Sequence, residues 1–594
     1  MTNPLPRTLQ LRLREHQIFL VLSIVIGVLA GLAAVLFTVA IDQTSHRLFG
    51  LTPSRLRLFL IPTLLSVPTG VLLATIFPGV RGSGLPQTKA AYRLQGGFIR
   101  ARVPFGKFLT GVLSIGAGHS MGPEGPSVQI GAGLASVIGR WVGLSPTRAR
   151  DLVPVAAAAA LASAFNTPVA AVLFALEEII GDLNAPLLGS AVIASVASVI
   201  VERSILGNEP LFHVPTYHLV HPAELAAYAV LGVIGGVLSL VFCKGLLGAR
   251  LLFRRLPRWT MSFQPAIGGM LVGLALIAAP AVMGVGYEYV DQALNGGLLL
   301  KTMALLCVMK LVATIISCSS GAAGGIFAPS LYIGAMAGGA VGFVVHRFAP
   351  FPTGDPGAYA LVGMGTVFAG IVRTPMTSVF MIFEITQDYQ ILVPLMVANM
   401  LSFLISKRYQ PLSINDAILQ QDDVHLPPPA ADQAAATSVT ARALMRADAP
   451  LFDPAMTIAA AAARSAQDRS TACLVGTGRR LLGMVTAEHL AAALAAGRGA
   501  EPLKELLDPD ADTFVHVHPD HPVETVFDRF GQSGGVLPVV SRTDARRVEG
   551  VVTLDDLVAF GRPRRQAPKP HVEPAPPVST SAPSTPASSI DTPS

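Results

Sequence analysis

The stretch MGPEGPSVQIGAG, residues 121–133, holds a single carboxylate, Glu124, among glycines and prolines, with apolar sequence on both sides. The second part of the stretch, PSVQIGA from Pro126, has a close copy in PSLYIGA from Pro329. A carboxylate at membrane depth is costly to bury and is a functional candidate by default. This stretch therefore raises two questions: how the two copies are related, and why a charge is kept in apolar surroundings.

A second pair of copies answers the first question. NTPVAAVLFALE, residues 166–177, matches RTPMTSVFMIFE, residues 373–384, and in both a glutamate follows the proline by nine residues. The two pairs are offset by 203 and 207 residues, so they keep their order and spacing. The Thr-Pro that opens each copy predicts an N-cap residue followed by proline at the first helical position. Two related halves are typical of transporters, whose repeats are often inverted and meet at the site.

The composition is that of a membrane protein. Of the 594 residues 51% are hydrophobic and 13% are charged, and the mean hydropathy is +0.56. Several apolar runs reach the roughly 20 residues that a spanning helix needs, and others are shorter or interrupted by Gly and Pro. Broken helices of that kind persist at membrane depth only when protein or a cavity surrounds them. The predicted fold class is an all-α polytopic membrane domain followed by a smaller α/β domain.

Charge and cysteine content exclude other classes. The net charge of +6 is modest for this length and does not indicate a nucleic-acid partner. The four cysteines lack metal-ligand spacing, and no nucleophile–base pair stands out, so neither a metal site nor an enzyme is predicted. Arg7, Arg12 and Arg14 precede the first apolar run and predict an N-terminus in the cytosol.

Shifts in amino-acid composition divide the chain into four segments. Residues 1–420 form the predicted membrane domain, and the polar, Pro-rich residues 421–437 a linker. Residues 438–562 alternate β-branched and Ala/Leu-rich runs and predict a soluble α/β domain. Residues 563–594 are rich in Pro, Ser and Thr and are expected to be disordered.

Three glycine-rich segments are candidates for binding an anion. They are GSGLP at 82–86, GPEGP at 122–126 and GGIFAP at 324–329, and each precedes a helical pattern. Helix N-termini present unpaired N–H groups and a partial positive charge, and glycine allows an ion to approach the backbone. None of the segments continues into the Gly-Lys-Ser/Thr of a P-loop, so nucleotide phosphates are not the expected ligand.

Four glutamates lie in the apolar sequence and fall into two groups. Glu124 and Glu178 are predicted to be functional, whereas Glu177 and Glu384 match across the repeat and are interpreted as structural, either capping a buried helix or facing a cytosolic vestibule. An ionised carboxylate beside an anion site imitates the anion and occupies the site. A protonated carboxylate is neutral and withdraws, so that proton and anion occupancy become linked.

The three glycine-rich segments, in this order and spacing, resemble those of the CLC chloride channel and transporter family over roughly residues 15–420. The resemblance implies two inverted halves with tilted and broken helices, and a homodimer with one pore in each subunit. It also implies a multi-pass protein of the lipid bilayer that carries chloride and protons. We expect a bacterial inner (plasma) membrane, with both termini cytoplasmic.

The resemblance assigns a chloride-binding set. The hydroxyl of Ser83, in the segment that also holds Gly84, contacts the anion, and Ile326 and Phe327 offer it backbone N–H groups. Asn415 stands where the family expects a tyrosine hydroxyl at the inner side of the site. An asparagine amide can donate to an anion, but it lacks the ring that narrows the inner path.

The resemblance also assigns gating and proton transfer. Glu124 matches the external gating glutamate, and Lys107, seventeen residues earlier, matches a lysine near the pore. Glu178 matches the inner glutamate that takes protons from the cytosol. Because channels of the family usually carry an apolar residue there, Glu178 favours chloride/proton exchange. Asn415 motivates the alternative of a passive chloride channel, gated by voltage or protons.

The soluble domain resembles a tandem pair of CBS modules, whose closing segments are residues 481–494 and 548–560. In nucleotide-binding members a Thr/Ser and an Asp three residues later hold the ribose. Thr553 and Asp556 fit this pattern. Two alternatives stay open, one adenine-nucleotide site or a purely structural pair, and no other cofactor is expected. A nucleotide-sensing regulatory membrane protein is the alternative function of a different class.

Overall fold

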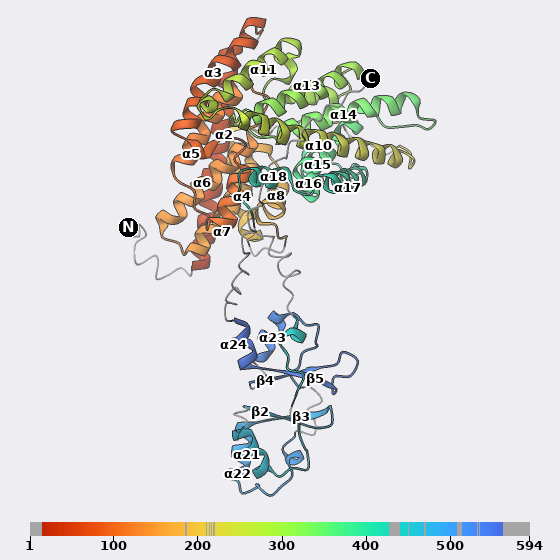
Figure 1. Cartoon of the computed structure of the whole chain (residues 1–594). Coiled ribbons are helices and arrows are strands. Elements are labelled where there is room, and N and C mark those ends of the chain that lie inside the picture. Colours follow the sequence, from red (N-terminus) through yellow and green to blue (C-terminus); the bar gives the residue numbers. More distant parts are fainter. Residues whose placement is uncertain are drawn as a thin grey trace, which may run out of the picture. The chain divides into compact units, whose positions relative to one another are not determined.

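The structure is a computed structural model of the chain, and it divides into two compact units, Met1–Asp432 and Gln433–Ser594 (Figure 1). It describes residues 15–50, 52–183, 187–208, 211–212, 214–215, 217, 220–426, 440–449, 451–467, 471–507, 514–531, 533 and 535–561. Most of the predicted linker, 427–437, and all of the tail predicted to be disordered, 563–594, lie outside the described residues. The domain boundaries stay predictions.

The first half of the membrane unit runs from red to yellow in Figure 1. Its elements are α2 (Glu15–Phe49), α3 (Arg55–Thr75), η1 (Pro78–Val80), α4 (Leu85–Leu94), α5 (Arg102–Gly116), α6 (Glu124–Val142), α7 (Pro146–Phe165), α8 (Pro168–Phe174), η2 (Ala175–Ile180) and α9 (Leu188–Leu206). Proline opens α7 and α8, where its missing N–H costs no hydrogen bond.

The second half repeats this order. Its elements are α10 (Glu224–Arg255), η3 (Arg258–Ser262), α11 (Gln264–Ala278), η4 (Pro280–Val282), α12 (Tyr287–Leu294), α13 (Leu300–Ser319), α14 (Phe327–Phe348), α15 (Pro356–Val372), α16 (Pro375–Thr386), α17 (Leu392–Tyr409) and α18 (Ile414–Gln421). The pairs α6/α14 and α8/α16 begin 203 and 207 residues apart, as the sequence copies predict. Six of the described helices are long and apolar enough to cross a membrane.

Each half caps a helix of the other. Both carboxylate oxygens of Glu384 accept hydrogen bonds from the start of α8, at 2.9 Å from Val169 N and 2.8 Å from Ala170 N. In return Glu177 accepts from the start of α16, at 3.0 Å from Thr377 N and 2.8 Å from Thr377 Oγ1. A carboxylate is stabilising at a helix N-terminus because it meets the free N–H groups and the positive end of the dipole. Of the two structural interpretations of these glutamates, this geometry agrees with helix capping.

The Thr-Pro prediction is confirmed, because Thr167 and Thr374 are the N-cap residues of α8 and α16, but neither threonine caps through its hydroxyl. Pro168 and Pro375 are the first residues of α8 and α16. The hydroxyls of Thr167 and Thr374 make no capping hydrogen bond, and both are buried without a partner among the described residues. The physical reason is that a glutamate from the opposite half binds the N–H groups that a threonine cap would have used.

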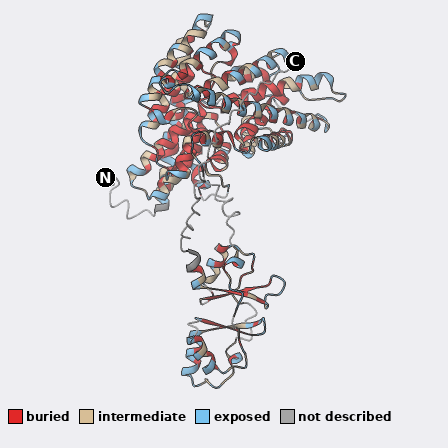
Figure 2. Ribbon diagram, in the orientation of Figure 1, coloured by how far each residue is buried: buried red, intermediate tan, exposed pale blue. Residues whose placement is uncertain are grey.

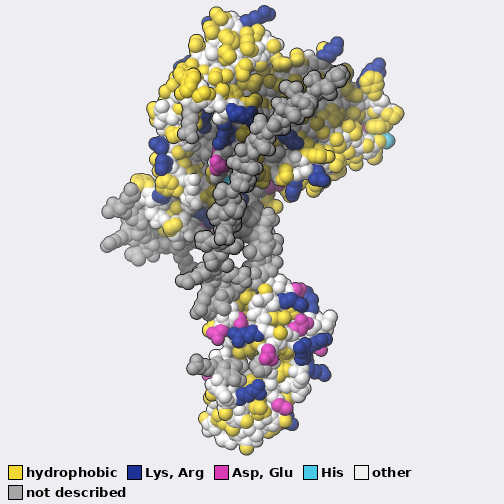
Figure 3. All heavy atoms as spheres, viewed as in Figure 1, with side chains coloured by type: hydrophobic (Ala, Val, Ile, Leu, Met, Phe, Trp, Pro, Cys, Tyr) yellow, Lys and Arg dark blue, Asp and Glu magenta, His cyan; other side chains and the backbone are white. Residues whose placement is uncertain are grey.

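Small residues let the central helices approach closely. α15 is buried along nearly its whole length, and so is most of α7, including the alanine run 156–160 (Figure 2). A Cβ on Gly334 of α14 would overlap the carbonyl of Gly363 in α15, so this crossing requires glycine. Long apolar side chains of α2, α9 and α10 instead point outward, and hydrophobic atoms dominate the visible surface of this unit (Figure 3).

The second unit has the predicted α/β character. Its elements are α20 (Ala441–Leu444), β1 (Leu451–Phe452), α21 (Ile458–Gln467), β2 (Ala472–Thr477), β3 (Arg480–Thr486), α22 (Ala487–Ala495), η5 (Leu503–Leu506), α23 (Val523–Phe530), β4 (Val536–Val540), β5 (Val548–Thr553) and α24 (Leu554–Gly561). β1 pairs parallel with β2, and β2 pairs antiparallel with β3. β4 and β5 form a second, antiparallel pair. The two predicted strand–turn–helix segments are β3–α22 and β5–α24.

Candidate functional site

The three glycine-rich segments meet in space. Gly122 and Gly325 exchange two backbone hydrogen bonds, with N–O distances of 2.9 and 2.7 Å. Gly324 N donates to the carbonyl of Gly82 at 3.3 Å, which ties the third segment to the other two. Because α4, α6 and α14 begin within these segments, three helix N-termini converge there. This convergence is the arrangement that the sequence predicts for an anion site.

Glycine is required at two of these positions. Gly84, the N-cap of α4, has φ = 93°, and a Cβ there would lie 2.6 Å from Oε1 of Gln129 and 2.8 Å from Cε of Lys107. A Cβ on Gly122 would overlap the carboxylate of Glu124. The segments are therefore packed against the side chains that surround the site.

Glu124 is fully buried at the first position of α6. Its Oε1 accepts a hydrogen bond of 2.8 Å from the hydroxyl of Tyr287, at the start of α12. Its Oε2 lies over Gly122, and the backbone N–H groups of Glu124 itself and of Ala328, in the first turn of α14, interact with the carboxylate. The carboxylate thus lies between two helix N-termini, where their dipoles attract negative charge. Tyr287 was missed from the sequence, since nothing local connects it to Glu124.

Two cavities border the converging segments. One, of about 640 Å³, is lined by Ser83 and Ile326. The other, of about 500 Å³, is lined by Pro123, next to Glu124, and by Tyr287. Phe327 is buried, with its ring edge-on to two other phenylalanines, Phe174 and Phe368. Ser83 and Ile326, just before α4 and α14, therefore line the same cavity, and contact of any predicted chloride residue with an anion stays a prediction.

Two fully buried lysines support the loops of the site. Lys107 donates to the carbonyls of Val80 at 2.8 Å and Gly82 at 2.6 Å. Lys310 donates to carbonyls of the matching loop, at 2.7 Å to Gly284. The two lysines are 203 residues apart, the same offset as the repeat, and applying that offset to Lys107 would have found Lys310. Lys107 thus ties α5 to the loop that leads into the first glycine-rich segment, and its predicted electrostatic role at the pore stays a prediction.

Glu178 is buried in η2 and belongs to a polar cluster that the sequence did not predict. Lys89 of α4 places its Nζ 3.2 Å from Oε1 of Glu178 and 2.7 Å from Oδ1 of Asp416. Asn415 donates its side-chain amide to Oε1 of Glu178 at 3.0 Å. Asn415, expected at the chloride site, is thus engaged with the inner glutamate, and its contact with chloride stays a prediction. The sequence feature that could have indicated this cluster is Lys89, a charged residue in the buried helix that follows Ser83.

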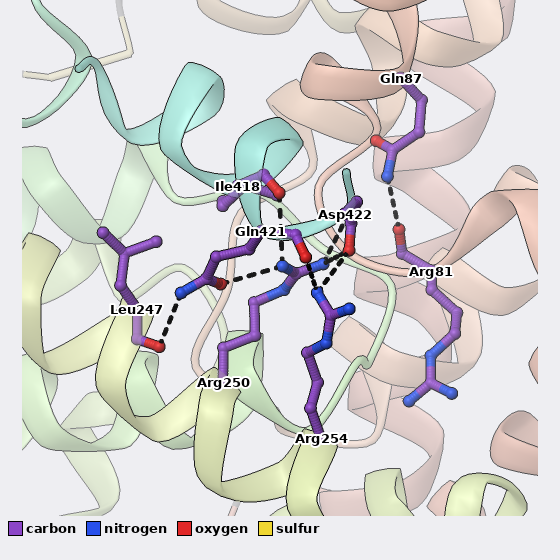
Figure 4. A network of polar contacts seen from close by, with 8 residues as sticks. All are labelled: Arg81, Gln87, Leu247, Arg250, Arg254, Ile418, Gln421 and Asp422. Carbon is purple, nitrogen blue, oxygen red and sulfur yellow. Dashed lines mark hydrogen bonds and ion pairs between the residues drawn. The ribbon is translucent and has the colours of Figure 1, made fainter. Parts of the chain in front are cut away.

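A basic network lines the larger cavity (Figure 4). Arg250 and Arg254 both pair with Asp422, just after α18, at 2.7 and 3.1 Å. Arg81, beside the first glycine-rich segment, also lines this cavity and donates to Gln264 Oε1 at 2.9 Å. Three arginines against one aspartate leave this lining positive, which raises the local concentration of anions next to Ser83.

In the second unit, Thr553 and Asp556 are bonded to each other. Oδ2 of Asp556 accepts from Thr553 N at 2.9 Å and Thr553 Oγ1 at 2.7 Å, which is the back-bond of a capping box at the start of α24. Oδ1 pairs with Arg446 at 2.6 Å. Burial alone would raise the pKa of Asp556, but the hydrogen bonds from Thr553 and Arg446 outweigh it and hold the pKa below its ordinary value.

These features together define the class: a membrane transport protein built from two repeats, with an anion-attracting site where three helix N-termini meet around a buried carboxylate.

Comparisons with known proteins agree with this class. The family model described as "Voltage gated chloride channel" matches residues 63–407, and a CBS domain model matches residues 505–562. A ClcB-like chloride channel protein of Ralstonia nicotianae is 32% identical over 376 residues, covering 62% of this chain and 87% of the relative. The H(+)/Cl(-) exchange transporter ClcA of Vibrio cholerae is 31% identical over 395 residues, covering 64% of this chain and 84% of the relative. The crystal structure of a slow cyanobacterial Cl-/H+ antiporter has a TM-score of 0.62 and 27% identity, covering 68% of this chain and 97% of that one.

The chain therefore belongs to the voltage-gated chloride channel (CLC) family and carries a CBS domain at its C-terminal end. It is an integral membrane protein with the CLC fold.

Proposed function

We propose that this protein exchanges chloride for protons across a membrane. The observation that carries the proposal is the position of the Glu124 carboxylate, which lies between the N-termini of α6 and α14. A negative carboxylate at that point competes with an anion for the same N–H groups and dipoles. The names of the Vibrio cholerae relative and of the cyanobacterial structure, both exchangers of chloride and protons, support it.

The exchange cycle uses two acids. Ionised Glu124 occupies the site, and protonated Glu124 becomes neutral and withdraws, which admits chloride from either cavity. Glu178, the second buried acid, delivers protons from the side of α18. Anion movement and proton movement are coupled because one carboxylate takes part in both.

Flux measurements in proteoliposomes test the proposal. A pH gradient should drive chloride uptake against its own gradient, with protons moving the opposite way. Glu124→Gln and Glu178→Gln should each abolish proton movement and leave chloride movement. Glu288→Gln is the matched control, because Glu288 is an exposed acid that lines the same cavity as Tyr287. Chloride flux that reverses at the chloride equilibrium potential at every pH gradient would instead establish the passive channel that Asn415 motivates.

We propose further that the protein is a homodimer in the inner (plasma) membrane of a bacterium, with cytoplasmic termini. Cross-linking in membranes followed by denaturing electrophoresis tests the dimer. Protease treatment of sealed, oriented vesicles, with a tag on the C-terminus, tests the orientation.

Adenine nucleotide at Thr553 and Asp556 stays a proposal, supported by the fit of these residues to the ribose pattern. Titration of the full-length protein with AMP or ATP tests it, and Thr553→Ala serves as the comparison. Binding that is absent, or that is equal in both proteins, would leave the pair of modules a structural element.

A further inference from the structure

The buried acid Glu178 is in contact with a second, more exposed acid through one lysine. The side chains of Lys89 and Glu178 are 6% and 5% exposed, whereas that of Asp416 is 31% exposed. Lys89 Nζ lies 3.2 Å from Glu178 Oε1 and 2.7 Å from Asp416 Oδ1. The three groups therefore form a continuous path from a partly exposed carboxylate to a buried one.

Other neighbours of Glu178 do not offer such a path among the described residues. The amide of Asn415 donates to the same Oε1 at 3.0 Å, and an amide at neutral pH neither takes nor releases a proton. Arg93 on α4 and Arg373, just before α16, act electrostatically on both Glu178 and Asp416. Guanidinium groups stay protonated in proteins, so these arginines bias the cluster without relaying protons.

We propose that Asp416 and Lys89 are the proton-transfer residues that load Glu178. The inference rests on the proposed chloride/proton exchange and names the inner proton entrance of that exchange.

The relay balances without any further reactant. Asp416 takes a proton from a hydronium ion, which leaves as water, and then passes that proton to Lys89, while the Lys89 ammonium gives one of its own protons to Glu178. The O–H bond of Asp416 and one N–H bond of Lys89 break, and a new N–H bond and the O–H bond of Glu178 form. Lys89 ends as it began, Asp416 returns to carboxylate, and Glu178 becomes neutral.

Two substitutions distinguish a proton relay from an ion pair that only stabilises the fold. Lys89→Arg keeps the positive charge between the carboxylates but cannot release a proton. Asp416→Asn keeps the size of the side chain but removes its titration. Asp423→Asn is the matched control, because Asp423 is an exposed acid two residues beyond the same helix, at a φ of 59° that asparagine also tolerates.

The test measures proton and chloride fluxes together in proteoliposomes of the full-length protein. We expect Lys89→Arg and Asp416→Asn to slow proton movement about 100-fold, the scale of a lost proton-transfer group, while chloride movement continues. Asp416→Glu should restore proton movement, and Asp423→Asn should keep the wild-type ratio of protons to chloride.

Two results would contradict the proton relay, and a third, different result would contradict the chloride/proton exchange on which it rests. A wild-type ratio in Lys89→Arg would show that Lys89 acts by charge alone. A wild-type ratio in Asp416→Asn would show that protons enter elsewhere. Wild-type protein that moves chloride without protons would remove the proposed exchange itself. If Lys89→Arg fails to fold, the Asp416 pair of variants decides the question.

Discussion

Replacing Tyr287 with phenylalanine should release the gate carboxylate. The substitution deletes the hydroxyl of Tyr287, which donates a hydrogen bond of 2.8 Å to Glu124. Among the described residues, this is the hydrogen bond that Glu124 receives from a side chain. A hydrogen bond to a charged group contributes about 1.5–3 kcal/mol. Losing it should shift the ratio of seated to withdrawn carboxylate by roughly 10- to 150-fold.

Chloride binding reports this ratio directly. Chloride binds only to those protein molecules whose site is not occupied by Glu124. The apparent Kd for chloride therefore equals the intrinsic Kd divided by the fraction of molecules in which the site is vacant. In the structure the carboxylate occupies the site. Tyr287→Phe should therefore increase the fraction of vacant sites and lower the apparent Kd for chloride by about 10- to 150-fold. Titration calorimetry of the purified full-length protein with chloride, at fixed pH, measures it.

A double-mutant cycle separates the gate from the site. Glu124→Ala removes the competitor, so Tyr287→Phe should have no further effect in that background. Tyr289→Phe is the matched control, since Tyr289 lines the same cavity two residues along α12. The reasoning is refuted if Tyr287→Phe leaves chloride affinity unchanged while Glu124→Ala tightens it. It is equally refuted if the tyrosine variant has the same effect with and without the glutamate.

Three further predictions follow from individual contacts. Glu384→Ala should destabilise the membrane unit by about 2–3 kcal/mol, because it removes both charge-assisted hydrogen bonds at the start of α8, and thermal unfolding in detergent measures this loss. Gly122→Ala should push the Glu124 carboxylate out of its position and weaken proton coupling, whereas a coupling ratio equal to that of the wild type would contradict the close contact. Asp556→Ala should speed amide hydrogen exchange in the first turn of α24. Since the pKa of Asp556 is lowered in the folded unit, the stabilisation by its carboxylate is present above the unfolded pKa of about 3.9 and is lost as the pH falls through the folded value.

The inner cluster shows where prediction from the sequence stopped. Glu178 was found because it lies in an apolar helix and matches the family pattern. Lys89 and Asp416 were not, because they are 89 and 238 residues away from it in the sequence and no repeat connects them. Asn415 was assigned to chloride from the family resemblance, and only the structure shows that its amide also donates to Glu178.

The sequence by itself determined the two halves, the three glycine-rich helix starts and the identity of the acids at membrane depth. These are local properties: glycine and proline restrict or free the backbone where they stand, and an apolar run with one carboxylate is visible without a fold. Only the tertiary structure decided which partner each buried charge has. Tyr287 reaches Glu124 across 163 residues, and Glu177 and Glu384 cap each other's halves, because the packing of the repeats brings helix ends together that are distant in the chain. A buried charge is stable only with a partner, and the choice of partner depends on that packing.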